Sequence, residues 1–139
     1  MFKKFAIIAF IVVVGIMASG WALRADQAGA AAPTVTRTVL NQQDLPMPGG
    51  YAAALVRVQL PVGAREGRHQ HPGTLIATVA EGTMTLEVEG KGVLTFKTGE
   101  TFNVPPGTVH EGMNKSGAPI TLIASFVFPK DKPMTVPVK

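Results

Sequence analysis

Residues 34–128 are made of short β-prone runs that glycine and proline interrupt at regular intervals. No apolar pattern in this part keeps a helical spacing for long, and glycine and proline mark turns. The clearest run, Thr83–Glu89, places Met84, Leu86 and Val88 on one face and polar residues on the other, as a half-buried strand does. Strands this short and evenly spaced predict an all-β antiparallel sandwich or barrel. The runs expected as strands are Thr34–Leu40, Ala52–Leu60, Leu75–Ala80, Thr83–Glu89, Val93–Lys97, Thr101–Val104, Val109–Asn114 and Ile120–Phe128.

The first 30 residues have the order of a secretory signal. Lys3 and Lys4 give a positive start, an almost unbroken apolar stretch follows, and small residues around Ala30 resemble a cleavage site. We expect residues 1–30 to be a signal peptide or an uncleaved membrane-anchor helix, because residues 5–23 approach the length of about 20 residues that crosses a bilayer. A third interpretation is a buried helix of a soluble protein.

Both main interpretations place a single domain, residues 31–139, outside the cytoplasm. The two N-terminal lysines favour a cytoplasmic start, so the protein is expected to be exported, periplasmic or extracellular, and to touch a membrane only through residues 1–23 if these are not cleaved. The tail after Pro129 contains Pro133 and Pro137 and is expected to be an extended cover strand or a loose arm.

Composition excludes several kinds of site. The chain of 139 residues contains no cysteine, so a disulfide, a CxxC redox pair and a thiolate metal site are all ruled out, and a metal must use nitrogen or oxygen ligands. Of the net charge of +4, half lies in residues 1–30. The charge that remains is too weak and too dispersed to indicate nucleic-acid binding.

The three histidines of the chain form a candidate metal site. His69 and His71 are two residues apart, so on a strand their side chains share one face. His110 follows the stiff segment Pro105–Gly107 at the start of another expected strand. Neutral imidazole ligates divalent metals, and three such ligands leave positions open for water or substrate. The alternative is that they are surface histidines on loops.

Two segments resemble the sequence motifs of the cupin superfamily. Residues 63–71 place a glycine five residues before an HxH pair, as in the first motif, which would end at Gly82. Residues 99–114 have the spacing of the second motif: glycine, five residues, PxG, two residues, histidine, three residues and asparagine. The resemblance covers roughly residues 52–128. It implies a double-stranded β-helix, or jelly roll, with a metal held inside the barrel.

The chain departs from the first motif at one position. The family usually carries a glutamate four residues after the second histidine, where this sequence has Leu75. The resemblance therefore implies a site of three neutral imidazoles, in which the metal keeps its full charge, acts as a stronger Lewis acid and is held less tightly. Arg65, Glu66 and Arg68 are expected to rim the cavity or to be merely exposed, and Glu111 to be solvated on the opposite face.

Three functions fit these residues. The first is an enzyme acting on a small oxygenated organic molecule, dioxygenase-like with iron, or isomerase- or decarboxylase-like with manganese, zinc or nickel. The second is a non-catalytic metal- or small-ligand-binding module or sensor, and the third is a purely structural barrel. The expected partners are a small-molecule substrate or ligand and a second copy of the chain in a homodimer, because a small sandwich leaves sheet edges and apolar surface uncovered.

Overall fold

Residues 31–139 are described by a computed structural model, and the alternating sequence pattern recurs in its strands. In β2 (Tyr51–Leu60) every second residue from Ala52 to Leu60 is buried. Strand β2 pairs along its whole length with β9 (Ile120–Pro129), which alternates in the same way. The signal peptide or anchor helix expected for residues 1–30 lies outside the described residues. Within residues 31–139, no helix is long and apolar enough to span a bilayer.

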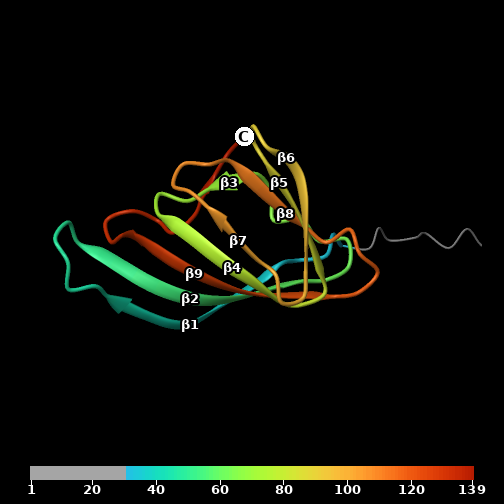
Figure 1. Cartoon of the computed structure of the whole chain (residues 1–139), viewed down its shortest axis with the longest axis horizontal. Helices are drawn as coiled ribbons and strands as arrows, with labels where there is room; N and C mark the ends of the chain where they lie inside the picture. The colour runs from blue at the N-terminus through green and yellow to red at the C-terminus, as the bar shows by residue number, and fades with distance from the viewer. Residues whose placement is uncertain (1–30) are drawn as a thin grey trace, which may run out of the picture. The chain divides into compact units, whose positions relative to one another are not determined.

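The strands form two five-stranded antiparallel sheets, so the all-β expectation is confirmed (Figure 1). The first sheet has the order β1 (Thr36–Asp44), β2, β9, β4 (Thr74–Glu81) and β7 (Thr101–Val104). The second has the order β10 (Val136–Pro137), β3 (His69–Gln70), β8 (His110–Met113), β5 (Thr83–Val88) and β6 (Gly92–Lys97).

From β2 onward the chain passes repeatedly from one sheet to the other. Strands β2, β4, β7 and β9 lie in the first sheet, whereas β3, β5, β8 and β10 lie in the second. This winding is that of a double-stranded β-helix, as the resemblance implied. At the crossing from β4 to β5, Gly82 has a φ of +90°, and a Cβ there would lie 2.7 Å from the carbonyl oxygen of Pro119. Only glycine fits such a turn without strain.

The core fills the space between the two sheets. Val56, Ala77 and Leu122 point inward from the first sheet, and Met84 and Leu86 from the second. Burying such side chains is the main favourable contribution to folding, at about 1.5–3 kcal/mol for each large one. The same inward faces form the walls of the cavity described below.

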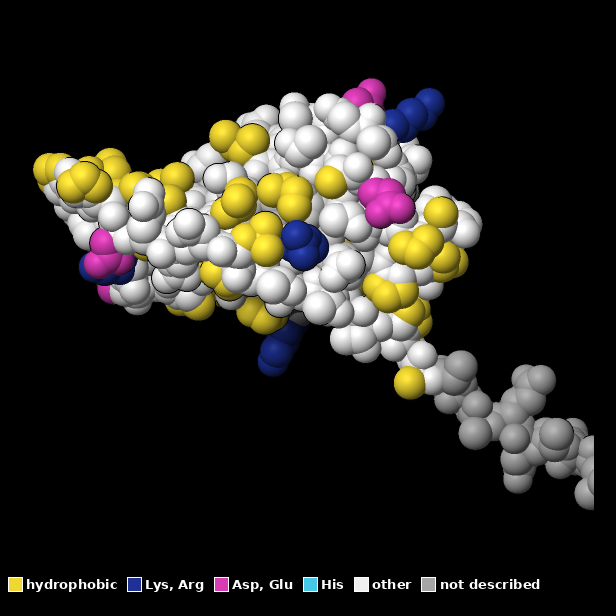
Figure 2. All heavy atoms as spheres, turned by 90° about the horizontal axis from the view of Figure 1, so that it is seen from below, with side chains coloured by type: hydrophobic (Ala, Val, Ile, Leu, Met, Phe, Trp, Pro, Cys, Tyr) yellow, Lys and Arg dark blue, Asp and Glu magenta, His cyan; other side chains and the backbone are white. Residues whose placement is uncertain are grey.

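Strand β1 differs from the sequence-based expectation. It covers residues 36–44 instead of 34–40 and is exposed throughout, because it is an edge strand paired only with β2. A register shift between Val39 and Asn41 interrupts its pairing. Figure 2 shows one face of the molecule, on which hydrophobic side chains form several clusters with few charged groups between them. No histidine is visible on that face.

Candidate metal centre

Pairing between β3 and β8 brings the three histidines together. The two strands are in register at His69 and His110, so these side chains lie next to each other on one face. His71 follows β3 by one residue and shares the face of His69. All three side chains are buried, and their potential ligand atoms lie within 4.8 Å of one another. The structure therefore brings together the three residues that the sequence predicted, and the alternative of surface histidines is wrong.

Backbone carbonyls fix the orientation of each ring. The Nδ1 atom of His69 donates to the carbonyl oxygen of Gly67 at 2.8 Å, and that of His110 to Thr108 at 2.9 Å. The Nδ1 atom of His71 donates to the carbonyl oxygen of Met134 at 2.9 Å. A carbonyl can only accept, so Nδ1 carries the proton in each ring and Nε2 keeps a free lone pair. Histidines that ligate metals are typically held by such a hydrogen bond on the other nitrogen.

The Nε2 atom of His71 shows how well a cation fits this arrangement. It is buried and, among the described residues, has no hydrogen-bond partner. Buried polar atoms nearly always have a partner, and a divalent cation next to three lone pairs would supply one. The three rings lie with centroids 4.3–4.9 Å apart, so they approach each other closely enough for a shared ion. The cluster could hold a metal ion.

Burial also keeps two of the imidazoles neutral. It lowers the pKa of His71 to about 4, because the charged form is poorly solvated, and the hydrogen bond to Met134 opposes the shift only in part. Burial lowers the pKa of His110 to about 4 in the same way, against the opposing hydrogen bond to Thr108. Protons therefore compete weakly for these two nitrogens at neutral pH.

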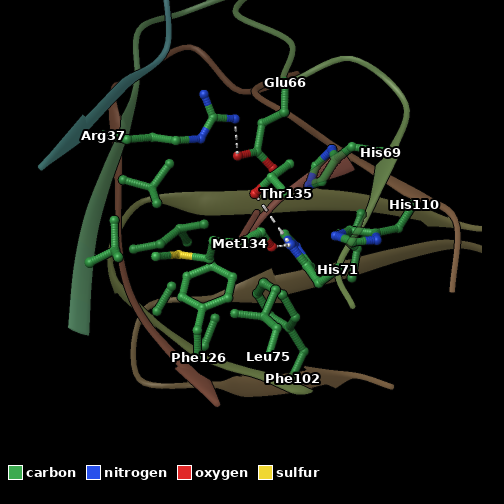
Figure 3. A pocket seen from close by; sticks show the side chains of 16 residues that line it. Arg37, Glu66, His69, His71, Leu75, Phe102, His110, Phe126, Met134 and Thr135 are labelled. Atoms are coloured by element: carbon green, nitrogen blue, oxygen red, sulfur yellow. Dashed lines mark hydrogen bonds and ion pairs between the residues drawn. The ribbon is translucent and has the colours of Figure 1, made fainter. Parts of the chain in front are cut away.

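The histidines form one end of a small, largely apolar cavity inside the barrel (Figure 3). Its volume is about 50 Å³. Leu75, which occupies the position of the missing motif glutamate, is buried and lines this cavity, as the motif register predicted. The other apolar walls come from both sheets and are Val56, Val58, Ala77, Leu86, Phe102, Leu122, Ala124 and Phe126.

Several further residues of the cavity were not predicted from the sequence. Arg37 reaches it from β1, and Met134 and Thr135 reach it from the C-terminal tail. The run from Val35 to Val39 contained a signal for Arg37, since this residue shares a face with two apolar side chains. The tail gave no such signal, because its place depends on the pairing of β10 with β3.

The charged residues before and after the histidines divide between two faces. Glu66 lines the cavity, which is the first of the two alternatives expected for it. Arg68 lies outside the cavity and pairs with Glu89 at 2.6 Å. The expectation of a solvated Glu111 is wrong: its carboxylate is buried and accepts hydrogen bonds from Arg65 at 2.9 and 2.6 Å. That partner lowers the pKa of Glu111.

Known proteins share this architecture. An uncharacterised conserved protein with a double-stranded β-helix domain from Klebsiella pneumoniae is similar with a TM-score of 0.61 and 23% identity over 79% of this chain and 87% of its own. The DMSP lyase DddQ from Ruegeria pomeroyi has a TM-score of 0.56 and 20% identity, over 70% of this chain and 51% of its own. An oxalate oxidase has a TM-score of 0.57 and 22% identity, over 80% of this chain and 57% of its own. At these identities the likeness shows the fold.

Sequence comparison assigns the family. No curated protein matches the chain by sequence. The family model of the cupin domain, however, matches residues 56–127. This segment contains all three histidines and both motifs, and it makes up more than half of the chain. The chain therefore belongs to the cupin domain family.

Proposed function

We propose that His69, His71 and His110 bind one divalent metal ion through their Nε2 atoms, and that this centre acts on a small oxygenated organic molecule. The observation that carries the proposal is the convergence of three buried imidazoles whose Nδ1 atoms are all committed to backbone carbonyls. In each ring Nε2 thus carries a lone pair and no proton, so the three rings cannot hydrogen-bond to one another through these atoms and all three can bind a cation. Of the metals expected from the sequence, iron, zinc and nickel are suited to imidazole ligands, whereas manganese prefers oxygen ligands.

A metal bound by three protein ligands would supply Lewis acidity and open positions for the oxygen atoms of a substrate. The residues of the chain would do the rest. Leu75, Phe102 and Phe126 surround the centre with apolar surface, which excludes water and strengthens electrostatic interactions inside. The cavity volume of about 50 Å³ restricts the substrate to a small molecule or to one end of a larger one.

The chemistry depends on the metal. Iron would suit a dioxygenase-like reaction, in which substrate and dioxygen bind side by side, whereas manganese, zinc or nickel would suit isomerisation or decarboxylation of a chelating oxyacid. Two proteins of similar fold are named as enzymes, an oxalate oxidase and a DMSP lyase, so this barrel supports catalysis elsewhere. Their low identity transfers no substrate to this chain.

One observation favours a second function. With Leu75 in place of the motif glutamate, no carboxylate belongs to the ligand cluster within the described residues. A non-catalytic module that holds a metal or a small ligand would need no further group.

One experiment separates the two functions. The purified protein is loaded in turn with iron(II), manganese, zinc and nickel and incubated with a panel of small oxyacids, diketones and phenolics. Oxygen uptake and NMR follow turnover, and His110→Ala serves as the control. Turnover that requires His110 supports the enzyme. Metal bound at one ion per chain without turnover of any panel member would favour the binding module.

We further propose that the domain is exported to the periplasm or beyond the cell. The proposal is supported by the order of charged, apolar and small residues within residues 1–30. Cell fractionation, with the size of the mature chain measured by mass spectrometry, tests it. A full-length protein found in the cytoplasm would contradict it.

A further inference from the structure

We propose that Glu66 is the acid–base residue of the cavity and that Arg37 positions it. The inference rests on the proposed function, because the proton in question comes from a chelating O–H group of a substrate that binds at the three histidines. The O–H bond breaks, its electron pair stays on the substrate oxygen, and the proton forms a bond to Oε2 of Glu66. The carboxylate becomes a neutral acid, so the step needs no further reactant.

The backbone of Glu66 is fixed beside the strand that carries His110. Its amide donates to the carbonyl oxygen of Gly112 in β8 at 2.9 Å, and the preceding residue, Arg65, forms a bridge with Met113. The side chain then turns into the cavity and is only 10% exposed. Figure 3 shows its carboxylate between Arg37 and the histidines. A carboxylate thus lies in an otherwise largely apolar pocket next to the centre.

Arg37 accounts for the presence of a charge at this place. In the pairing of β1 with β2 it lies opposite Val58, whose side chain is buried, so Arg37 lies on the face of β1 that lines the cavity, although its own side chain stays 43% exposed. Its Nη2 atom donates to Oε1 of Glu66 at 2.9 Å. An ionised carboxylate that is only 10% exposed is costly without such a partner. The pair occupies Oε1, and in the described part of the chain no hydrogen bond is made to Oε2.

Gly112 provides the space for the free oxygen. It is two residues from His110 on β8, so the two positions share a face. A Cβ at position 112 would lie 2.2 Å from Oε2 of Glu66 and 2.3 Å from Cε of Met84. The lack of a side chain therefore lets Oε2 lie against the strand, on the face that carries the metal-facing imidazole.

Glu111 is the matched control. It is also a buried carboxylate paired with an arginine, but Arg65 engages both of its oxygens, and it points to the other face of β8. A general effect of removing a buried carboxylate near His110 would appear in both Glu66→Gln and Glu111→Gln. If Glu66 takes up a proton inside the cavity, this uptake should be absent in Glu66→Gln and present in Glu111→Gln.

Calorimetry of probe binding measures this proton directly. Acetohydroxamate, a small chelating acid, is titrated into the zinc-loaded full chain in two buffers of different ionisation enthalpy, which gives the number of protons released per probe. We expect Glu66→Gln to release about one proton more than the wild-type protein, and Glu111→Gln to match the wild type. In Gly112→Ala the new methyl group pushes Oε2 aside, so this variant should also release more protons per probe than the wild type.

The outcomes separate this inference from the proposed function. Equal proton release by the wild type, Glu66→Gln and Gly112→Ala, with one zinc bound in each, would overturn the role of Glu66 and leave the metal centre intact. A wild-type protein that binds no zinc would overturn both. If Glu66→Gln fails to fold by circular dichroism, Gly112→Ala decides the question by the same measurement: more protons released than by the wild type supports the role of Glu66, and equal release overturns it.

Discussion

The Nδ1 atom of His71 donates to the carbonyl oxygen of Met134 at 2.9 Å, although the two residues are 63 positions apart. This contact makes the C-terminal tail a part of the metal centre. Strand β10 pairs with β3, and the amide of Val138 donates to the carbonyl oxygen of Arg68 at 3.0 Å. The tail is therefore a cover strand, one of the two alternatives expected from the sequence. It holds two of the proposed metal ligands in place, His69 through the pairing with β3 and His71 through Met134.

Removing residues 133–139 should weaken metal binding while the β-sheets remain. His71 would lose its hydrogen-bond acceptor, and β3 would lose its only partner besides β8 within the described sheet. Loss of a partner that orients a ligand typically weakens metal affinity about 10- to 100-fold. Isothermal titration with zinc measures the affinity, and removal of Lys139 alone is the control. Unchanged affinity after the longer truncation would contradict the role given to Met134.

Leu75→Glu should restore the ligand that the first motif usually carries. Leu75 lines the cavity next to the histidines, so a carboxylate there is expected to tighten metal binding by adding a charged ligand. The metal-free protein should become less stable, by on the order of 2 kcal/mol for the lost burial of leucine. Metal titration and thermal unfolding test both effects. Gln70→Ala is the control: Gln70 is half-buried, is paired with Val136 and does not line the cavity, and its loss should leave metal affinity unchanged.

The stability of the metal-free protein should fall in mild acid. In the folded chain burial lowers the pKa of His71 and of His110 to about 4, against 6.5 for the free group. Between these values the unfolded chain binds more protons, so the free energy of unfolding falls as pH decreases from 6.5 toward about 4. Thermal unfolding at pH 7 and pH 5, with metal removed, measures this fall. The double variant His71→Leu/His110→Leu should show a smaller dependence, and an equal one would contradict the assignment.

The sequence predicted the fold and the histidine cluster because both depend on local patterns. Alternation gave the strands, and the second motif placed His110 and Asn114 correctly. Asn114 has a structural role, since its Nδ2 atom donates to the carbonyl oxygens of Leu60 and Ala118. These features are fixed within a few residues of chain or by spacing alone.

The remaining residues of the cavity depend on long-range pairing, which spacing does not reveal. Arg37 reaches the site only because the register of β1 against β2 turns it inward. Met134 and Thr135 reach it only because the tail returns to β3. The burial of Glu111 likewise follows from Arg65, 46 residues earlier in the chain, lying over it.

The prediction of a homodimer remains to be tested. Strand β1 is an exposed edge of nine residues, and Leu55, Ile76 and Val127 are exposed on the outer face of the same sheet. Edges and apolar surface of this kind are commonly covered by a second copy. Light scattering at micromolar concentration should give twice the chain mass. A monomer mass would reject the prediction.

Metal content is the most direct measure of whether the three histidines act as one centre. The full chain is saturated with zinc at neutral pH and freed of excess metal, and its zinc content is measured by inductively coupled plasma mass spectrometry. We expect one zinc per chain in the wild type and in Glu111→Gln, and loss of stoichiometric zinc in His69→Ala, His71→Ala and His110→Ala, because two neutral ligands bind too weakly. Zinc retained at one ion per chain after any single histidine substitution would contradict the three-histidine centre.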